Sequence, residues 1–269
     1  MTTPVLEAIN VSKGFRQRTG VMKTHGTLIN AVQGVSCALK PGERLGLVGE
    51  SGCGKTTLAK LLVGLLPPDQ GEVRVQGTSW TQQRGVARQV ARRAIQFVFQ
   101  DPMMSLNPRM TVEETLREPL VIHQLVPPHA RSRRVQELLA VVRLPTTYAQ
   151  RLPRTLSGGE RQRVSIARAL ATHPRVLICD EPIASLDISV GVHILELLRH
   201  LSQQRHMALL FISHDLRAVA SLCDRVAVMS QGRLIESGPT PQVLHHPMHP
   251  YTTLLLKSSA LELDDIPSA

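Results

Sequence analysis

The chain has 269 residues, 42% of them hydrophobic and 3% aromatic, and its 31 Lys+Arg against 21 Asp+Glu leave a net charge of +10. This apolar content supports a sizeable core and excludes a disordered chain, and no apolar run approaches the roughly 18 residues that cross a bilayer. The positive charge suits an anionic partner such as lipid headgroups or nucleic acid, although few aromatic rings are available on which bases could stack.

The four cysteines are scattered and form no Cys-x-x-Cys pair: Cys37, Cys53, Cys179 and Cys223. Such spacing is typical of reduced thiols rather than of a disulfide framework or a metal site. The N-terminus MTTPVLEAIN lacks the basic and apolar regions of a signal peptide. We therefore expect a protein that is made in the cytosol and stays there.

The first two strands are expected near the N-terminus. Residues 5–15 and 31–40 each alternate apolar and polar side chains, which is the period of a half-buried strand. The stretch 16–30 between them is polar and contains glycine, and it predicts a long hairpin connection. The sequence thus indicates an antiparallel β unit at this end of the chain.

A glycine-rich loop, GESGCGKT, follows a short apolar run at 44–49 and precedes a helix expected over 57–66, which a Pro-Pro pair ends. This is the context that the phosphate-binding motif G-x-x-x-x-G-K-[ST] requires. The glycines let backbone N–H groups turn inward on a phosphate, and the helix start adds partial positive charge. Lys55 supplies a cation for the β- and γ-phosphates, and Thr56 supplies a hydroxyl for Mg²⁺. The loop predicts a protein that binds a nucleoside triphosphate.

Beyond a strand expected over 71–77, the chain changes character between residues 101 and 156. Apolar residues there recur at the spacing of one helix face, at Val135, Leu138, Leu139 and Val142. Prolines are expected to divide the segment into short pieces, at Pro119, Pro127, Pro128 and Pro145. We interpret this segment as a helical lobe inserted into the fold.

A second glycine turn, LSGGERQR at 156–163, opens the next predicted helix. Ser157 is a good N-cap, and Gly158 and Gly159 leave amides exposed at the helix start, so the physics of an anion site recurs here. The turn has no lysine and no metal-binding hydroxyl of its own, which suits it to complete a nucleotide pocket built elsewhere. A plain capping turn is the alternative.

Two acidic residues, Asp180 and Glu181, follow the apolar run 175–179. A buried strand places them at the carboxyl edge of a sheet, where such folds bind ligands, unless they only cap the next helix. Hydrolysis needs one group that positions Mg²⁺ and another that activates water, for which Asp180 and Glu181 respectively are the candidates. His214 follows the next apolar run, 208–213, and is expected beside the same site, a purely structural histidine being the alternative.

Strands and helices alternate after residue 157, which predicts a mainly parallel sheet covered on both faces. One helix is expected to run through four apolar residues, Val192, Leu195, Leu198 and Leu201. The expected fold is α/β: a P-loop NTPase core with a mainly parallel sheet, an N-terminal antiparallel β subdomain and an inserted helical subdomain. We expect one domain, divided into a core at 1–100 and 157–240, a helical subdomain at 101–156 and a short helical tail at 241–269.

Over nearly the whole chain, the motifs and their order resemble those of the ATP-binding subunits of ABC transporters. The motifs are the glycine loop, Gln100 after IQFVF, LSGGERQR, the Asp180-Glu181 strand, the Ala184-Ser185-Leu186-Asp187 turn and His214. The resemblance implies a head-to-tail dimer, in which each LSGG turn closes over the ATP held by the partner's P-loop. The second glycine turn would then serve the nucleotide of the other subunit.

The resemblance also implies roles for single residues. ATP would be bound by Phe15, stacked on adenine where Tyr is commoner, and by Gly49, Ser51, Gly52, Cys53, Gly54, Lys55, Thr56 and Thr57. Mg²⁺ would be held, partly through water, by Thr56, Gln100 and Asp180. Catalysis would depend on Glu181 as general base, His214 on the γ-phosphate and Gln100 at the attacking water. The partner's ATP would be contacted by Ser157, Gly158, Gly159 and Asp187.

The implied cofactors are ATP and Mg²⁺, and the implied partners are proteins rather than nucleic acid. They are a second ATPase subunit, identical or related, and two integral membrane permease subunits, with an extracytoplasmic solute-binding protein acting indirectly. The implied location is peripheral, on the cytoplasmic face of the cell (inner) membrane. An ABC-type ATPase acting on nucleic acid or ribosomes is the alternative, but such relatives usually join two ATPase domains or insert long coiled coils. A non-hydrolysing ATP-binding regulator is disfavoured because Glu181 and His214 are both present.

The polar insert after Phe15, the stretch FQDPMMSLNPRMTVEETLREPL and the tail GPTPQVLHHPMHPYTTLLL resemble the importer group for di- and oligopeptides, nickel and nickel chelates. Many peptide importers of this group carry a cysteine-bearing C-terminal extension, whereas no cysteine follows Cys223 in this sequence. In this respect the sequence is closer to the nickel or metallophore members. The solute therefore stays open. So does a regulatory metal site in the tail at His245, His246, Met248 and His249.

Overall fold

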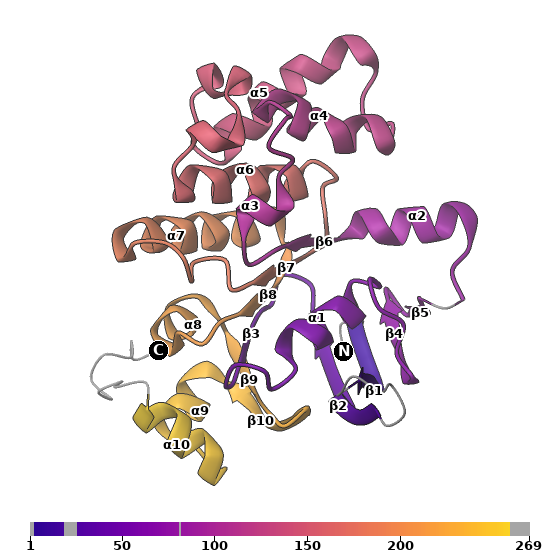
Figure 1. The fold of residues 1–269 in the computed structure, drawn as a ribbon, viewed down its shortest axis with the longest axis vertical. Helices are drawn as coiled ribbons and strands as arrows, with labels where there is room; N and C mark the ends of the chain where they lie inside the picture. Colours follow the sequence, from indigo (N-terminus) through magenta and orange to yellow (C-terminus); the bar gives the residue numbers. More distant parts are fainter. Residues whose placement is uncertain (1–2, 19–25, 81, 259–269) are drawn as a thin grey trace.

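The structure is a computed structural model that describes residues 3–18, 26–80 and 82–258. Helices pack around one β-sheet, a second sheet lies at the side of the molecule, and the helices of the middle of the chain stack at one end (Figure 1). One sheet has four strands in the order β2-β1-β4-β5, and the other has six in the order β10-β9-β3-β8-β7-β6. The fold is therefore α/β with an antiparallel N-terminal sheet, as the sequence predicts.

The antiparallel sheet extends further than the sequence pattern indicates. Residues 16–18 and 26–30, expected in the hairpin connection, belong to the strands, with Phe15 paired to Ile29. Exposed residues such as Arg16 and Asn30 can belong to the ladder because one face of an antiparallel sheet can remain in water. The rest of that connection, 19–25, lies outside the described residues. The strands are β1 (Leu6–Arg18), β2 (Gly26–Leu39), β4 (Gln70–Val75) and β5 (Thr78–Ser79).

The six-stranded sheet carries the core. Its strands are β3 (Arg44–Val48), β6 (Ile95–Val98), β7 (Val176–Asp180), β8 (Ala208–Ile212), β9 (Arg225–Ser230) and β10 (Arg233–Pro239). All neighbours pair in parallel except β9 and β10. Along β7, Val176 and Ile178 pack in one apolar cluster, and Leu177 and Cys179 pack in the other. Both faces of the sheet are thus buried, which explains why its strands are continuous apolar runs.

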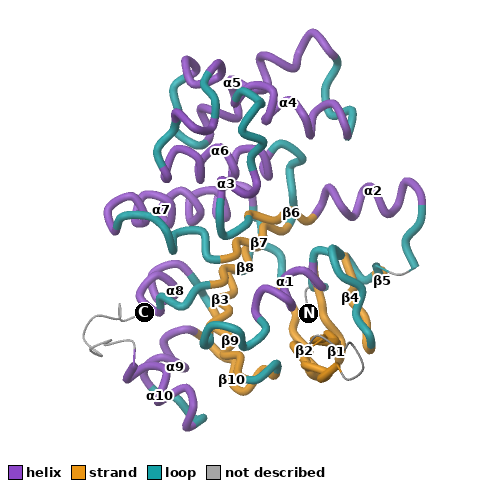
Figure 2. The backbone as a smooth tube through the Cα atoms, viewed as in Figure 1, coloured by secondary structure: helices purple, strands orange, loops and turns teal. Residues whose placement is uncertain are grey.

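Helices cover both faces of this sheet, as the tube in Figure 2 shows. They are α1 (Lys55–Leu62), α2 (Gly85–Ala94), α3 (Pro102–Ser105), α4 (Val112–Ile122), α5 (Arg131–Val141), α6 (Gly158–Leu170), α7 (Ile188–Arg205), α8 (Leu216–Leu222), α9 (Thr240–His245) and α10 (Pro250–Ser258). Short 3₁₀ turns lie at Pro128–Ala130, Thr146–Gln150 and Pro153–Thr155. The sequence pattern did not predict α2.

The helical segment between residues 101 and 156 contains α3, α4 and α5. The predicted apolar face of α5 is confirmed, since Val135, Leu138, Leu139 and Val142 are all buried. The expected break at Pro119 is wrong, because this proline lies inside α4. Proline costs about 3 kcal/mol in a helix interior, and α4 continues because its apolar residues on both sides, Leu116 and Leu120, are fully buried.

Two other helices differ from expectation. Helix α1 ends at Leu62, before the Pro-Pro pair, because Gly64 takes a left-handed φ of 72° and the N–H of Leu65 closes on the carbonyl of Lys60. The predicted helix through Val192, Leu195, Leu198 and Leu201 is present as α7, but Val192 is exposed, and the buried stripe also includes Ile194 and Leu197. The first turn of α7 faces mainly solvent, so the buried stripe begins later in the helix.

All four cysteines are free thiols. Burial raises the pKa of the Cys37 thiol to about 11, so this cysteine is neutral at ordinary pH. Over the described parts of the chain, no helix combines the length and the apolar character that crossing a membrane requires.

Candidate nucleotide site

The glycine loop links the end of β3 to the start of α1. Gly54 caps α1 with a left-handed φ of 111°, and a Cβ there would lie 2.1 Å from the backbone oxygen of Ala31. A Cβ at Gly49 would lie equally close to backbone, 2.1 Å from the oxygen of Met229. Gly52 faces open space. Gly54 and Gly49 must be glycines because neighbouring backbone packs against them, whereas Gly52 leaves room for a ligand.

Lys55 is prepared for an anion. It is only 5% exposed, and its Nζ donates to the backbone oxygens of Gly49 at 2.7 Å and Glu50 at 2.8 Å. An ammonium has three donors, and among the residues that the structure describes the third meets only the weak acceptor Sγ of Cys53 at 3.9 Å. Burial raises the pKa of the Cys53 thiol, which Lys55 opposes, so this acceptor is uncharged. A phosphate oxygen would be a far better acceptor for the third donor.

A cavity of about 450 Å³ opens above the loop. It brings together Ser51, Gly52 and residues 54–57 with Gln100, Glu181 and His214, which come from three further segments of the chain. Ala31 of β2 lines it as well and was not predicted, because an alanine at a strand position carries no chemical signal. Gly49 and Cys53 support the loop from behind rather than lining the cavity.

Glu181 stands at the centre of the polar groups. Its Oε2 lies 3.1 Å from Nδ1 of His214 and accepts from Nε2 of Gln100 at 3.5 Å. The N-cap of the following helix, α7, is Asp187, so the alternative that the acidic pair only caps this helix is wrong. A carboxylate, an imidazole and an amide thus converge beside the phosphate-binding loop.

Asp180 lies beneath them at the end of β7. It is 3% exposed, and its Oδ1 has no hydrogen-bond partner among the described residues. Burial raises the pKa of this carboxyl, while the hydrogen bond with Thr56 lowers it and the charge of Glu181 raises it further. A buried carboxylate oxygen without a partner beside a threonine hydroxyl is a suitable pair of ligands for a hard cation.

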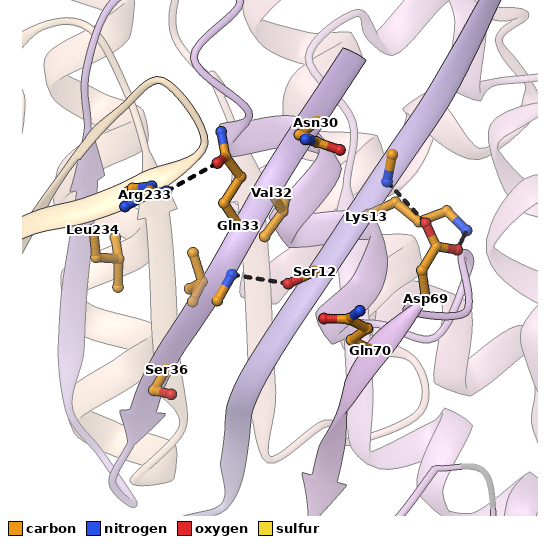
Figure 3. A pocket seen from close by; sticks show the side chains of 13 residues that line it. Ser12, Lys13, Asn30, Val32, Gln33, Ser36, Asp69, Gln70, Arg233 and Leu234 are labelled. Carbon is orange, nitrogen blue, oxygen red and sulfur yellow. Dashed lines mark hydrogen bonds and ion pairs between the residues drawn. The ribbon is translucent and has the colours of Figure 1, made fainter. Parts of the chain in front are cut away.

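Phe15 lines neither this cavity nor the larger one beside it. Its side chain is 40% exposed, and it lies on β1 near the end of the strand, where the described part of the β1–β2 hairpin stops. The larger cavity, of about 790 Å³, lies between β1, β2, the start of β4 and β10 (Figure 3). Its cations have partners, because Lys13 is paired with Asp69 at 2.6 Å and Arg233 donates to Gln33 at 3.3 Å. We therefore do not assign it to a triphosphate.

The second glycine turn lies outside the nucleotide cavity of its own chain. Ser157 caps α6 in a reciprocal capping box with Glu160, and both Ser157 and Gly158 are exposed. Gly159 is buried, and a Cβ there would lie 2.3 Å from Cγ1 of Val190. Asp187 lines a groove of about 490 Å³ that it shares with His214. Most of the predicted residues thus fall into two sets, one around the P-loop and one at the starts of α6 and α7, where Ser157, Gly158 and Asp187 are exposed and Gly159 is buried.

One contact of the glycine loop could not be predicted from the sequence. The backbone N–H of Glu50 donates to the hydroxyl of Tyr251, 201 positions away in α10, at 3.1 Å. No spacing rule connects two residues so far apart.

The comparisons with known proteins agree with this geometry. A model of the family described as ABC transporter matches residues 32–184. A putative peptide import ATP-binding protein of Brucella abortus is 46% identical over 86% of this chain and 70% of its own length. The glutathione import ATP-binding protein GsiA of Pectobacterium atrosepticum is 41% identical over 98% of this chain, which spans only 44% of that relative. A dimeric ATP-binding cassette, MJ0796, solved in a post-hydrolysis state with ADP and Pi, superposes with a TM-score of 0.77, at 28% identity over 87% of this chain and 98% of its own.

Proposed function

Because this chain belongs to the ABC transporter family of ATP-binding proteins, we propose that it is the ATP-hydrolysing subunit of a peptide importer. The observation that carries the proposal is the cavity of about 450 Å³, in which a phosphate-binding loop meets Gln100, Glu181 and His214. These are the groups that phosphoryl transfer to water needs, because its catalysis is mostly positioning and charge stabilisation. The chain is an ATPase of the ABC type.

ATP binding is supported by the loop and by the start of α1. Residues 54–57, which end the loop and begin α1, line the cavity, so their backbone N–H groups would bind the β-phosphate, and Lys55 would donate its third N–H to a phosphate oxygen. Phe15, partly exposed on β1, is available to stack on adenine.

The residues present also fit Mg²⁺. Thr56 and the unpaired Oδ1 of Asp180 supply oxygen ligands, and Gln100 lines the same cavity. When bound, Mg²⁺ would neutralise charge on the β- and γ-phosphates.

The position of Glu181 suits this residue to act as the general base in hydrolysis. Its carboxylate takes a proton from a water molecule that the amide of Gln100 orients, and the water oxygen attacks the γ-phosphorus. The bond between γ-phosphorus and the bridging oxygen breaks, and ADP leaves with that oxygen. His214, beside Glu181, would donate a hydrogen bond to the γ-phosphate.

The exposed second glycine turn supports a shared site. Ser157 and Gly158 face solvent and lie outside the cavity of their own chain, so they are free to meet the nucleotide of a second subunit. Asp187, exposed at the start of α7, would lie in the same interface. Each ATP would then be enclosed by both subunits, and its cleavage would release them.

A groove of about 470 Å³ between α1 and α4 suits a membrane subunit. Its wall includes Phe99 and Ile122, both exposed apolar residues, and Phe99 immediately precedes Gln100. A groove of mixed polar and apolar lining next to Gln100 would transmit closure of the nucleotide site to a permease. The protein would be peripheral on the cytoplasmic face of the membrane, and a binding protein would act only through the permeases.

The two relatives reported above are named for peptide and glutathione import, and for that reason we favour a short peptide over nickel as the solute. The test is to purify the chain with the permeases encoded beside it and measure ATP hydrolysis with binding protein loaded with a dipeptide, a tripeptide or nickel. Stimulation by a peptide alone supports the proposal, and stimulation by nickel alone replaces the solute. No hydrolysis under any condition overturns the ATPase function.

The groove is tested in the same complex. Ile122→Glu, at a position 60% exposed, should lose copurification with the permeases while ATP hydrolysis by the free subunit persists. Val86→Glu, 75% exposed on α2 and outside the groove, is the matched control.

A further inference from the structure

We propose that Tyr251 is a positioning residue for the phosphate-binding loop, through which the C-terminal helix α10 sets the affinity for ATP. The inference rests on the proposed function, because it assumes that the loop binds ATP. Tyr251 does not line the nucleotide cavity, so it acts through the backbone of the loop.

The contact fixes one peptide group from both of its ends. The peptide that joins Gly49 to Glu50 donates its N–H to the hydroxyl of Tyr251 at 3.1 Å, and its carbonyl accepts from Nζ of Lys55 at 2.7 Å. Each bond polarises the peptide in favour of the other. Only Glu50 separates this peptide from Ser51, the first loop residue that lines the cavity, so the orientation of the peptide influences where the following amides point.

The Tyr251 hydroxyl is held in place by the tail around it. The carboxylate of Glu236 on β10 accepts from the N–H groups of Met248 at 2.8 Å and His249 at 3.1 Å. Nδ1 of His249 then accepts from the N–H of Tyr251 at 3.1 Å, which closes the first turn of α10. Tyr251 and Leu255 also pack against the apolar cluster that contains Leu177 and Cys179 of β7. The chain of contacts therefore runs from β10 through α10 to the loop.

The catalytic groups do not depend on this contact. Gln100, Glu181 and His214 follow β6, β7 and β8, whose positions are set by the buried sheet. Losing the Tyr251 hydroxyl should let the loop sample other orientations when empty, so ATP binding would have to select the competent one. Hydrolysis of ATP already bound should be unchanged.

The test is Tyr251→Phe, which removes one oxygen and keeps the ring. A neutral hydrogen bond of this kind corresponds to a change of about two- to tenfold in affinity. We expect Kd and KM for ATP to rise by about that factor, kcat to stay within about twofold, and the Tm to be unchanged. Ser258→Ala, which removes a hydroxyl that donates only within α10, is the control and should alter none of these.

Wild-type affinity in Tyr251→Phe would overturn the inference, whereas a wild-type protein that binds no ATP would instead overturn the proposed function. A second variant, Glu236→Gln, weakens the anchor of α10 and should raise KM in the same direction. Because both changes act through one contact, their combination should raise KM no more than the larger of the two. Fully additive effects would show that Glu236 does not act through Tyr251.

Discussion

Glu181 lies where the chain turns sharply out of β7. Its φ of 46° falls in the left-handed region, which costs a non-glycine residue of order 1–3 kcal/mol. The backbone is held there by an N–H bond to the carbonyl of Ile212 at 2.9 Å, and the side chain meets His214 and Gln100. A strained backbone that presents a carboxylate to a phosphate site is what a general base in a fixed position requires.

Glu181→Gln should therefore leave ATP binding intact and slow hydrolysis by roughly 10²–10⁴-fold, which corresponds to about 3–5 kcal/mol of barrier. The amide keeps the shape of the side chain and loses its basicity. The measurement is single-turnover hydrolysis beside an ATP titration, with Glu196→Gln on α7 as the control. Near-wild-type turnover would remove Glu181 from this role.

Asp180 and Asp224 form a contrast at the same scale. Burial raises the pKa of Asp180, so its ionisation makes the free energy of unfolding fall as the pH rises above the ordinary aspartate range. Burial acts in the same direction on Asp224, but hydrogen bonds with Arg44 outweigh it and hold the pKa below its ordinary value, so ionisation of Asp224 adds stability as the pH rises.

Asp180→Asn should accordingly raise the Tm at pH 7 in the absence of nucleotide by a few degrees, about 1 kcal/mol for a chain of this length. It should also abolish the dependence of ATP affinity on Mg²⁺. Asp224→Asn should lower the Tm and leave the Mg²⁺ dependence intact. The measurements are thermal unfolding and ATP titrations with and without Mg²⁺. A destabilised Asp180→Asn would contradict the account of an unpaired buried carboxylate.

At the scale of elements, the two glycines at the start of α6 are required for different structural reasons. Gly158 is exposed and free to approach a ligand, whereas Gly159 is buried against Val190 at the start of α7. Its missing side chain lets the two helix starts meet, so the second glycine turn and Asp187 are held as one surface. Packing within the chain thus explains a glycine that the sequence suggested was there only to expose an amide.

Gly159→Ala should overpack this contact and cost about 1–3 kcal/mol of stability. The double variant Gly159→Ala with Val190→Ala removes the clashing methyl groups and should recover most of that loss. Thermal unfolding of the single and double variants measures the coupling. If Val190→Ala gives no recovery, the close approach of α6 and α7 is not what requires the glycine.

Elements with a local cause were predictable from the sequence, and those decided by tertiary packing were not. The P-loop, the cap at Ser157 and the buried strand β7 follow from motif, cap chemistry and apolar pattern. The path of α4 through Pro119 depends on burial of its neighbours, and the exposure of Val192 depends on where α7 leaves the core. The meeting of Tyr251 with the loop depends on the whole path of the chain, so no window of residues could have indicated it.

At the scale of the molecule, a net charge of +10 opposes the association of two such chains. In the proposed dimer, a triphosphate would supply negative charge between the P-loop of one subunit and the second glycine turn of the other. We therefore expect dimers that form only with ATP. Salt should not weaken these dimers, because it screens the repulsion between the exposed positive charges more than it screens the contacts of the enclosed nucleotide.

Ser157→Arg tests this arrangement directly. The substitution removes the cap that Ser157 shares with Glu160, worth about 1 kcal/mol, and fills the space that a triphosphate would occupy against the turn. In the Glu181→Gln background, where ATP persists, the unmodified turn should give dimers by light scattering, and Ser157→Arg should give monomers that still bind ATP at the P-loop. Ser258→Arg, an equal charge change on α10, should still dimerise. Dimers that persist in Ser157→Arg would mean that the second glycine turn has no part in closing the site, and the exposed pair Ser157 and Gly158 would need another ligand.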